Sequence, residues 1–231
     1  MKAIDLFCGA GGAGMGLSQA GFEVVGVDSV EQKNYPFHLI TTNVGLLEPD
    51  FLRQFDFIWA SPPCQKFSSM TKGRWKDRKH ADWIGVTRNL LVESGRPYCI
   101  ENVVGAPLRK DLMLCGSMFG LQTKHGAQLR RHRIFECSFP TQQPECNHKK
   151  SGSVIGVYGG GQHPQRRRIP ATIGVYGHAG GSSKRDYLDF SCFKTQDRRD
   201  AMGIQWMSGK ELTQAVPPAY AKYIADQWGL I

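Results

Sequence analysis

The glycine-rich stretch after the first apolar run most constrains what this chain can fold into. Residues 3–7 read as a short strand, and residues 8–14, CGAGGAG, lead into apolar residues at helical spacing. Gly9, Gly11 and Gly14 match the GxGxxG pattern, in which a cofactor approaches the backbone closely between a strand and a helix. Residues 24–27 supply the next strand, and Asp28 at its tip can accept hydrogen bonds from both ribose hydroxyls of an adenosine cofactor.

Further apolar runs alternate with helical patterns along the chain. Residues 38–41, 57–60 and 98–100 read as strands, residues 83–94 as a helix ended by Gly95, and a last helix runs through Ala221, Ile224 and Trp228. This alternation predicts an α/β fold with a mainly parallel, Rossmann-like sheet. The carboxyl ends of the strands would then gather Gly9, Asp28, Asn43, Cys64 and Glu101 in one crevice. A dinucleotide and S-adenosylmethionine both fit the loop, but only the dinucleotide has a pyrophosphate, and the loop contains no basic residue.

Cys64 follows the buried run 57–60 in the turn Ser61-Pro62-Pro63-Cys64-Gln65, and the loop after it is rich in lysine and arginine. A free cysteine is usually a small buried hydrophobe. A cysteine at the exit of a strand, stopped there by two prolines, is typical of a nucleophile. Glu101 ends a later strand at the same predicted edge, so we expect it to be catalytic rather than a solvated loop charge.

Two other segments are basic. Residues 128–135 read as a strand that places Arg131 and Arg133 on one face, either in solvent or aimed at a carbonyl oxygen or phosphates. Residues 137–194 are rich in Gly, Gln, His, Arg and Ser and contain a near-repeat, IGVYG, at 155–159 and 173–177, which predicts two strands presenting polar loops unless the segment is disordered. Cys137, Cys146 and His148 fit no standard zinc spacing, so no metal is expected.

The totals narrow the class of protein. The 231 residues can hold one sizeable core, and the net charge of +9 favours a polyanionic partner, nucleic acid before membrane. The longest apolar runs are too short to span a membrane, and the first residues carry no signal-peptide pattern, so a cytoplasmic protein is expected. The seven cysteines have no regular spacing and fit a reducing compartment.

These motifs, in this order, resemble the DNA cytosine-C5 methyltransferase family, and the short length resembles its compact phage-type members. The resemblance covers residues 1–136 and 196–231 as an S-adenosylmethionine-binding catalytic domain and leaves 137–195 as a small target-recognition region. It rests on residues 5–12 (DLFCGAGG), 62–65 (PPCQ), 101–103 (ENV), 131–133 (RHR) and 214–218 (QAVPP). Leu129, Asn43 and Gln214 depart from the usual Gln, Asp and Asn.

The resemblance implies roles for individual residues. The catalytic set is Cys64, Glu101, Asn102, Arg131 and Arg133. S-adenosylmethionine would be held by Phe7, Gly9, Gly11, Gly12, Asp28, Asn43, Pro62, Gln214, Ala215 and Val216. Double-stranded DNA would be contacted by Gln65, Ser68, Arg74, Arg166, Arg167 and Arg168.

The implied reaction is methyl transfer to C5 of a cytosine flipped out of the duplex. Cys64 would attack C6 of the ring. A protonated Glu101 would donate a hydrogen bond to N3 and accept one from the amino group on C4, and Arg131 would hydrogen-bond O2. A monomer acting in the cytoplasm of a bacterial or phage-infected cell is expected, and the sequence leaves open whether it serves restriction–modification, phage self-protection or regulation. The alternatives are a tRNA cytosine-C5 methyltransferase, a DNA cytosine alkyltransferase with a modified sulfonium donor, and a DNA-binding relic without activity.

Overall fold

The computed structural model describes residues 1–63, 82–148, 154–157, 172–175 and 193–229. The chain divides into two compact units. The large unit comprises Met1–Leu114, His132–Gln143 and Val216–Ile231, and the small unit comprises Cys115–Arg131 and Pro144–Ala215. Seven of the predicted site residues lie outside the described residues: Cys64, Gln65, Ser68, Arg74, Arg166, Arg167 and Arg168.

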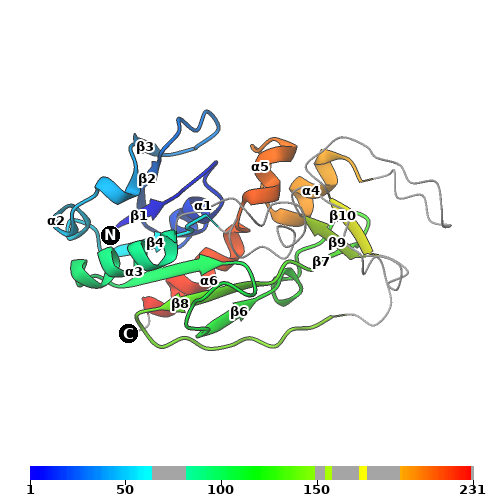
Figure 1. Ribbon diagram of the computed structural model, residues 1–231. Helices are drawn as coiled ribbons and strands as arrows, with labels where there is room; N and C mark the ends of the chain where they lie inside the picture. The colour runs from blue at the N-terminus through cyan, green and yellow to red at the C-terminus, as the bar shows by residue number, and fades with distance from the viewer. Residues whose placement is uncertain (64–81, 149–153, 158–171, 176–192, 230–231) are drawn as a thin grey trace. The chain divides into compact units, whose positions relative to one another are not determined.

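The described part of the large unit is built on one sheet with the strand order β3-β2-β1-β4-β5-β8-β6 (Figure 1). The strands are β1 (Lys2–Leu6), β2 (Glu23–Asp28), β3 (His38–Thr41), β4 (Phe57–Ala60), β5 (Tyr98–Asn102), β6 (Leu112–Leu114) and β8 (Arg133–Cys137). Strands β1 to β5 pair in parallel, whereas β8 is antiparallel to both β5 and β6. The expected α/β fold with a mainly parallel sheet is confirmed.

Helices cover both faces of this sheet. Side chains alternate along a strand, so Ile4 and Leu6 of β1 pack with Leu52 of α2 (Pro49–Leu52) and Leu91 of α3 (Trp83–Ser94). The opposite face packs on α1 (Gly12–Gln19) and α6 (Pro218–Trp228), where the ring of Phe57 lies 5.8 Å from that of Trp228.

Helices α1 and α6 approach each other closely at Gly16. A Cβ atom on this glycine would lie 2.2 Å from the carbonyl oxygen of Pro218. Any side chain at position 16 would therefore push the two helices apart.

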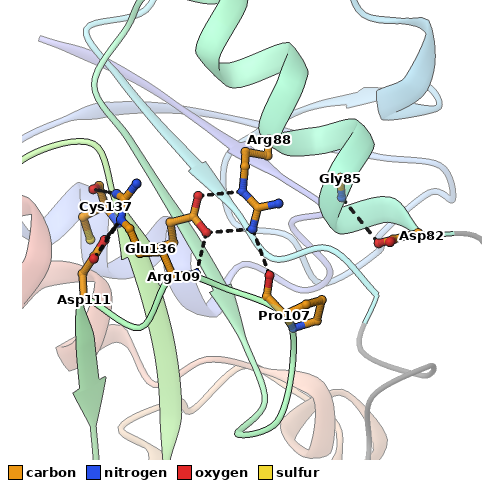
Figure 2. Close-up of polar contacts among 8 residues, drawn as sticks. All are labelled: Asp82, Gly85, Arg88, Pro107, Arg109, Asp111, Glu136 and Cys137. Carbon is orange, nitrogen blue, oxygen red and sulfur yellow. Dashed lines mark hydrogen bonds and ion pairs between the residues drawn. The ribbon is translucent and has the colours of Figure 1, made fainter.

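A buried carboxylate fastens α3 to the sheet (Figure 2). Glu136 of β8 accepts hydrogen bonds from Nε and Nη2 of Arg88, both at 2.8 Å, and from the backbone N–H of Arg109 at 2.9 Å. Arg88 also donates to the carbonyl of Pro107, and the side chain of Arg109 forms an ion pair with Asp111.

The small unit is organised around a second sheet, of parallel strands. Its described strands are β7 (Gln128–Leu129), β9 (Val154–Val157) and β10 (Thr172–Val175), in the order β10-β9-β7. The described helices of this unit are the 3-10 helix η3 (Gly116–Phe119), α4 (Thr195–Met202) and α5 (Gly209–Gln214). Residues 155–157 and 173–175 of the near-repeat thus lie in strands, as expected, and these two strands pair with each other.

The predicted continuous strand at 128–135 is wrong. Residues 128–129 pair with β9, whereas residues 133–137 belong to the other sheet, and the chain between them is not in a strand. Leu129 is buried in the small unit, and a Cβ atom on Gly116 would lie 2.8 Å from the Cβ of Leu129. The unusual Leu129 is therefore a packing residue, and the small unit takes in residues 115–131 in addition to most of the predicted recognition region.

No helix among the described residues is long and apolar enough to cross a membrane.

Candidate active site

The direction of the strands gathers chemically active residues at one edge of the large unit's sheet. Strands β1, β2, β4 and β5 are parallel, so Phe7, Asp28 and Asn102 all lie at their carboxyl ends. Strand β8 runs the other way, so its first residue, Arg133, lies at the same edge. Open α/β sheets bind their ligands at this edge.

The glycine-rich loop after β1 has the backbone that its sequence predicts. Gly9 and Gly11 have φ angles of 48° and 84°, a region that favours glycine, and Phe7 adopts a φ of 58° despite its side chain. The N–H of Gly9 donates to Oδ2 of Asp28 at 3.0 Å, and Oδ1 accepts from the N–H of Val30 at 3.1 Å. The loop and the Asp28 carboxylate are thus locked together, and a carboxylate oxygen has two lone pairs, so each retains acceptor capacity for a ligand.

Asp5 supports the same loop from inside the sheet. Its Oδ2 accepts from the N–H of Gly14, in the first turn of α1, at 2.9 Å. Burial, opposed by this hydrogen bond and reinforced by the charge of Asp28, raises the pKa of Asp5 to about 8. Burial and the carboxylates of Asp5 and Asp28 also raise the pKa of the Cys8 thiol, so Cys8 stays neutral and is no competing nucleophile. Sequence reasoning did not single out Asp5 as a site residue, although an acid within a buried strand is a signal.

Glu101 and Arg133 form an ion pair at this edge. Nε of Arg133 lies 2.8 Å from Oε1 of Glu101, and the two side chains are 12% and 8% exposed. The pairing of the strands explains the contact: Glu101 stands opposite Phe135, which makes Arg133 its diagonal neighbour on the same face. Glu101 is buried, as expected, and the guanidinium of Arg133 is the charged group beside it.

Asn102 connects this pair to the strand exit that leads to the predicted nucleophile. Its Nδ2 donates to the carbonyl of Pro62 at 2.9 Å, while its Oδ1 accepts from the N–H of Val103 at 2.9 Å. The side chain is 1% exposed, so water does not compete for these contacts. Pro62 is two residues before Cys64, so Asn102 fixes the backbone from which the cysteine departs.

Arg131 has a different environment from Arg133. It is fully buried, and its Nη2 donates to the carbonyls of Thr213 and Ala215 at 3.0 and 2.9 Å, all within the small unit. These carbonyls lie at the end of α5, where helix carbonyls need partners. Both hydrogen bonds of Nη2 are therefore to the backbone of the unit to which Arg131 belongs.

The other predicted cofactor residues are spread over both units. Asn43 is exposed, and its Oδ1 accepts from the N–H of Gly45 at 2.9 Å, so its amide is already used to cap a short 3-10 helix. Gln214 is exposed at the end of α5, Ala215 follows it in the small unit, and the buried Val216 begins the last segment of the large unit. Gly12 starts α1 and is buried.

Comparison with known proteins identifies the family. Residues 1–105 match the family model described as C-5 cytosine-specific DNA methylase. The chain is 30% identical over 194 residues to the Type II methyltransferase M.AgeI of Thalassovita gelatinovora, covering 67% of this chain and 45% of that protein. It is 36% identical over 115 residues to M.NgoPII of Neisseria gonorrhoeae, covering 46% of this chain and 34% of that protein. The chain thus spans less than half the length of these curated relatives.

Solved structures agree on the fold. DNMT2 from Spodoptera frugiperda superposes with a TM-score of 0.61 at 14% identity, covering 98% of this chain and 99% of that one. A putative DNA modification methyltransferase encoded within a prophage of E. coli superposes with a TM-score of 0.58 at 16% identity, covering 100% and 99%. With the glycine loop, the ENV segment and the reversed strand β8 in place, the chain belongs to the C-5 cytosine-specific DNA methylase family.

Proposed function

We propose that this protein is a DNA cytosine-C5 methyltransferase that transfers a methyl group from S-adenosylmethionine to a cytosine flipped out of duplex DNA. The observation that carries the proposal is the Glu101–Arg133 pair at the carboxyl edge, together with the Asn102 contact that holds Pro62. This arrangement supplies a carboxyl group and a guanidinium for a pyrimidine ring next to the strand exit of a cysteine.

The chemistry assigns a separate task to each residue. Cys64, as thiolate, would attack C6 of cytosine and make C5 nucleophilic. Glu101 would donate a hydrogen bond to N3 and accept one from the amino group on C4. To donate, its carboxylate would need to gain a proton when the ring displaces Arg133. Arg133 would donate a hydrogen bond to O2. A guanidinium has five N–H donors, and the contacts of Arg133 to Glu101 and to the His132 carbonyl involve two of its nitrogens, so it can also donate to the ring. The contacts of Arg131 favour a structural role, so the task at O2 falls to Arg133 rather than Arg131.

The glycine loop fits an adenosine cofactor. A Cβ atom on Gly9 would meet nothing within 4 Å, so the backbone at Gly9 is open to a ligand, and Asp28 beside it suits ribose hydroxyls. When bound, S-adenosylmethionine supplies an electrophilic methyl group. Phe7, Gly9, Gly11 and Asp28 would hold it, with Asn43 as a further contact.

Double-stranded DNA is the partner that the net charge of +9 and the Type II methyltransferase relatives support. The basic residues Arg74 and Arg166–168 would contribute phosphate contacts, and the small unit would read a short target. A cytosine must leave the stack before a thiol can reach C6, so base flipping follows from the chemistry. A DNA-modification role, as in restriction–modification systems, follows from the names of those relatives.

The decisive experiment combines transfer and trapping. Wild type and Cys64→Ser are each incubated with labelled S-adenosylmethionine and either unmethylated duplex DNA or tRNA. The mass of the cytosine product is then measured by mass spectrometry. A second arm uses DNA with 5-fluorocytosine, in which fluorine replaces the proton on C5 and cannot be removed by a base, so a covalent adduct should persist with wild type alone. The matched cysteine control is Cys137→Ala, which should transfer normally.

Each outcome is informative. One methyl group on cytosine of DNA, with an adduct that requires Cys64, supports the proposal. Transfer to tRNA instead would overturn the substrate, and a larger added group would overturn the donor. A folded protein that binds DNA and S-adenosylmethionine but transfers nothing would overturn the activity.

A further inference from the structure

Three potential metal ligands converge in the small unit, and none of them is a residue assigned to catalysis. Sγ of Cys115 lies 3.3 Å from Nε2 of His148, and Sγ of Cys146 lies 3.1 Å from the same nitrogen. The ligand atoms all lie within 4.8 Å of one another. From this geometry we infer that the small unit binds a zinc ion through Cys115, Cys146 and His148.

The distances are close to those a bound zinc would impose. Zinc binds thiolate sulfur at about 2.3 Å and imidazole nitrogen at about 2.0–2.1 Å, so sulfur and nitrogen ligands of one tetrahedral ion stand roughly 3.5 Å apart. A set of two thiolates and imidazole is soft and tetrahedral, which selects zinc over magnesium or calcium.

A second pair of neighbouring cysteines among the described residues, Cys99 and Cys137, serves as a comparison, because its contact is explained by core packing alone. Cys99 and Cys137 lie in the apolar core of the large unit, with their sulfurs 3.6 Å apart, both buried among strands. Cys146, by contrast, is exposed, and its sulfur is close to the ring of His148 and 3.6 Å from Oγ of Ser117. A hydroxyl beside a thiolate ligand is the kind of neighbour that orients metal ligands.

The surrounding contacts indicate a structural site. Cys115 immediately precedes η3, and Cys146 and His148 lie on the segment that leads towards β9. Gln128 of β7 donates to the carbonyl of Asn147 at 2.9 Å, so the same segment is also tied to the sheet. A metal here would close the chain between Cys115 and Cys146, and closing a long loop restricts the unfolded chain.

The three ligands of the small unit fill three of the four positions of a tetrahedral zinc ion. The site could not be predicted from the sequence, because Cys115 lies in an apolar turn that is distant in sequence from Cys146 and His148. The inference departs from the expectation of no metal, and it is independent of the proposed methyl transfer.

The test is metal analysis of the full chain, purified without a histidine tag and without chelators. We expect one zinc per chain in wild type, and visible bands of tetrahedral cobalt plus a sulfur-to-cobalt charge-transfer band after exchange with Co²⁺. Cys146→Ala and His148→Ala should lose the metal, with affinity falling by more than the roughly 10–100-fold that loss of a second-shell partner costs. Matched controls are His125→Ala, an exposed histidine of the same unit, and Cys137→Ala.

A second measurement covers variants that fail to fold. Wild-type protein is stripped with a chelator and then refilled, and thermal unfolding is followed in both states; a reversible fall in Tm supports the site. Wild type without stoichiometric metal and without a cobalt spectrum would overturn the inference. So would a disulfide between Cys115 and Cys146, detected as the loss of two hydrogens in the unreduced mass.

Discussion

Arg133 pairs with Glu101 at 2.8 Å, whereas Arg131, two positions earlier, donates to the backbone carbonyls of Thr213 and Ala215. The two arginines of one sequence motif therefore serve different units of the molecule. In the proposed reaction Arg133 contacts the pyrimidine, whereas Arg131 binds the backbone of the small unit.

Replacing each arginine by glutamine should separate these roles. Arg133→Gln should lower the single-turnover methylation rate by about 10²–10³, as for loss of a donor to a developing oxyanion, and should also lower Tm because the buried Glu101 loses its ion-pair partner. Arg131→Gln should lower the free energy of unfolding by about 2 kcal/mol or more, because buried carbonyls lose a charged donor. An Arg131→Gln protein with wild-type Tm and no methylation would instead place Arg131 on the ring.

The sequence was sufficient for the large unit because its signals are local and consistent. The predicted strands at 38–41 and 57–60 and the helix at 83–94 have the predicted bounds in the structure. Apolar periodicity and glycine or proline stops decided each of them. Parallel order then placed Gly9, Asp28 and Glu101 at one edge, as expected.

The errors arose where long-range pairing overrides local pattern. The stretch 128–135 alternates like one strand, yet β7 pairs with β9 and β8 pairs with β5, so the chain breaks between Leu129 and Arg133. The apolar periodicity within residues 128–135 does not indicate which strands these residues pair with. The neighbours of Cys115 and Asp5 depend on segments distant in sequence for the same reason.

Asn102 should affect the reaction through Pro62 rather than through substrate contact. Asn102→Ala removes the hydrogen bond to the Pro62 carbonyl and leaves it buried, so we expect about 1–3 kcal/mol of lost stability. Misplacing the Cys64 backbone by about 1 Å would slow the covalent step by roughly 10²-fold.

The readout is the rate of adduct formation with 5-fluorocytosine DNA, measured beside the Kd for DNA. The control is Asn89→Ala, an exposed asparagine on α3. A slower adduct with unchanged Kd is expected, whereas an unchanged adduct rate would remove Asn102 from any positioning role.

Glu136 should make the protein sensitive to acid. Burial alone would raise its pKa, but hydrogen bonds from Arg88 and the Arg109 backbone outweigh burial and lower the pKa below 4.5. A lowered carboxyl pKa contributes stability above the ordinary value, and this contribution is lost as pH falls through the folded-state pKa. Glu136→Gln should therefore cost about 2 kcal/mol at pH 7 and flatten the loss of stability below about pH 4.5.

Urea unfolding between pH 3 and pH 7 measures this effect, with the exposed Glu93→Gln as control. Equal stability of Glu136→Gln and wild type at pH 7 would mean that the network in Figure 2 does not fasten α3 to the sheet.

Asp5 should act in the opposite direction, at higher pH. Its pKa rises from 3.8 to about 8 in the folded protein, so between these values the folded state holds a proton that the unfolded chain has released. Unfolding then releases a proton, and stability falls as pH rises across this window, by up to about 1.4 kcal/mol per pH unit. Asp5→Asn removes the titration, so its stability relative to wild type should increase steadily from pH 4 to pH 8. Urea unfolding at each pH, with the exposed Asp226→Asn as control, measures the difference, and parallel curves would show that Asp5 ionises freely in the folded state.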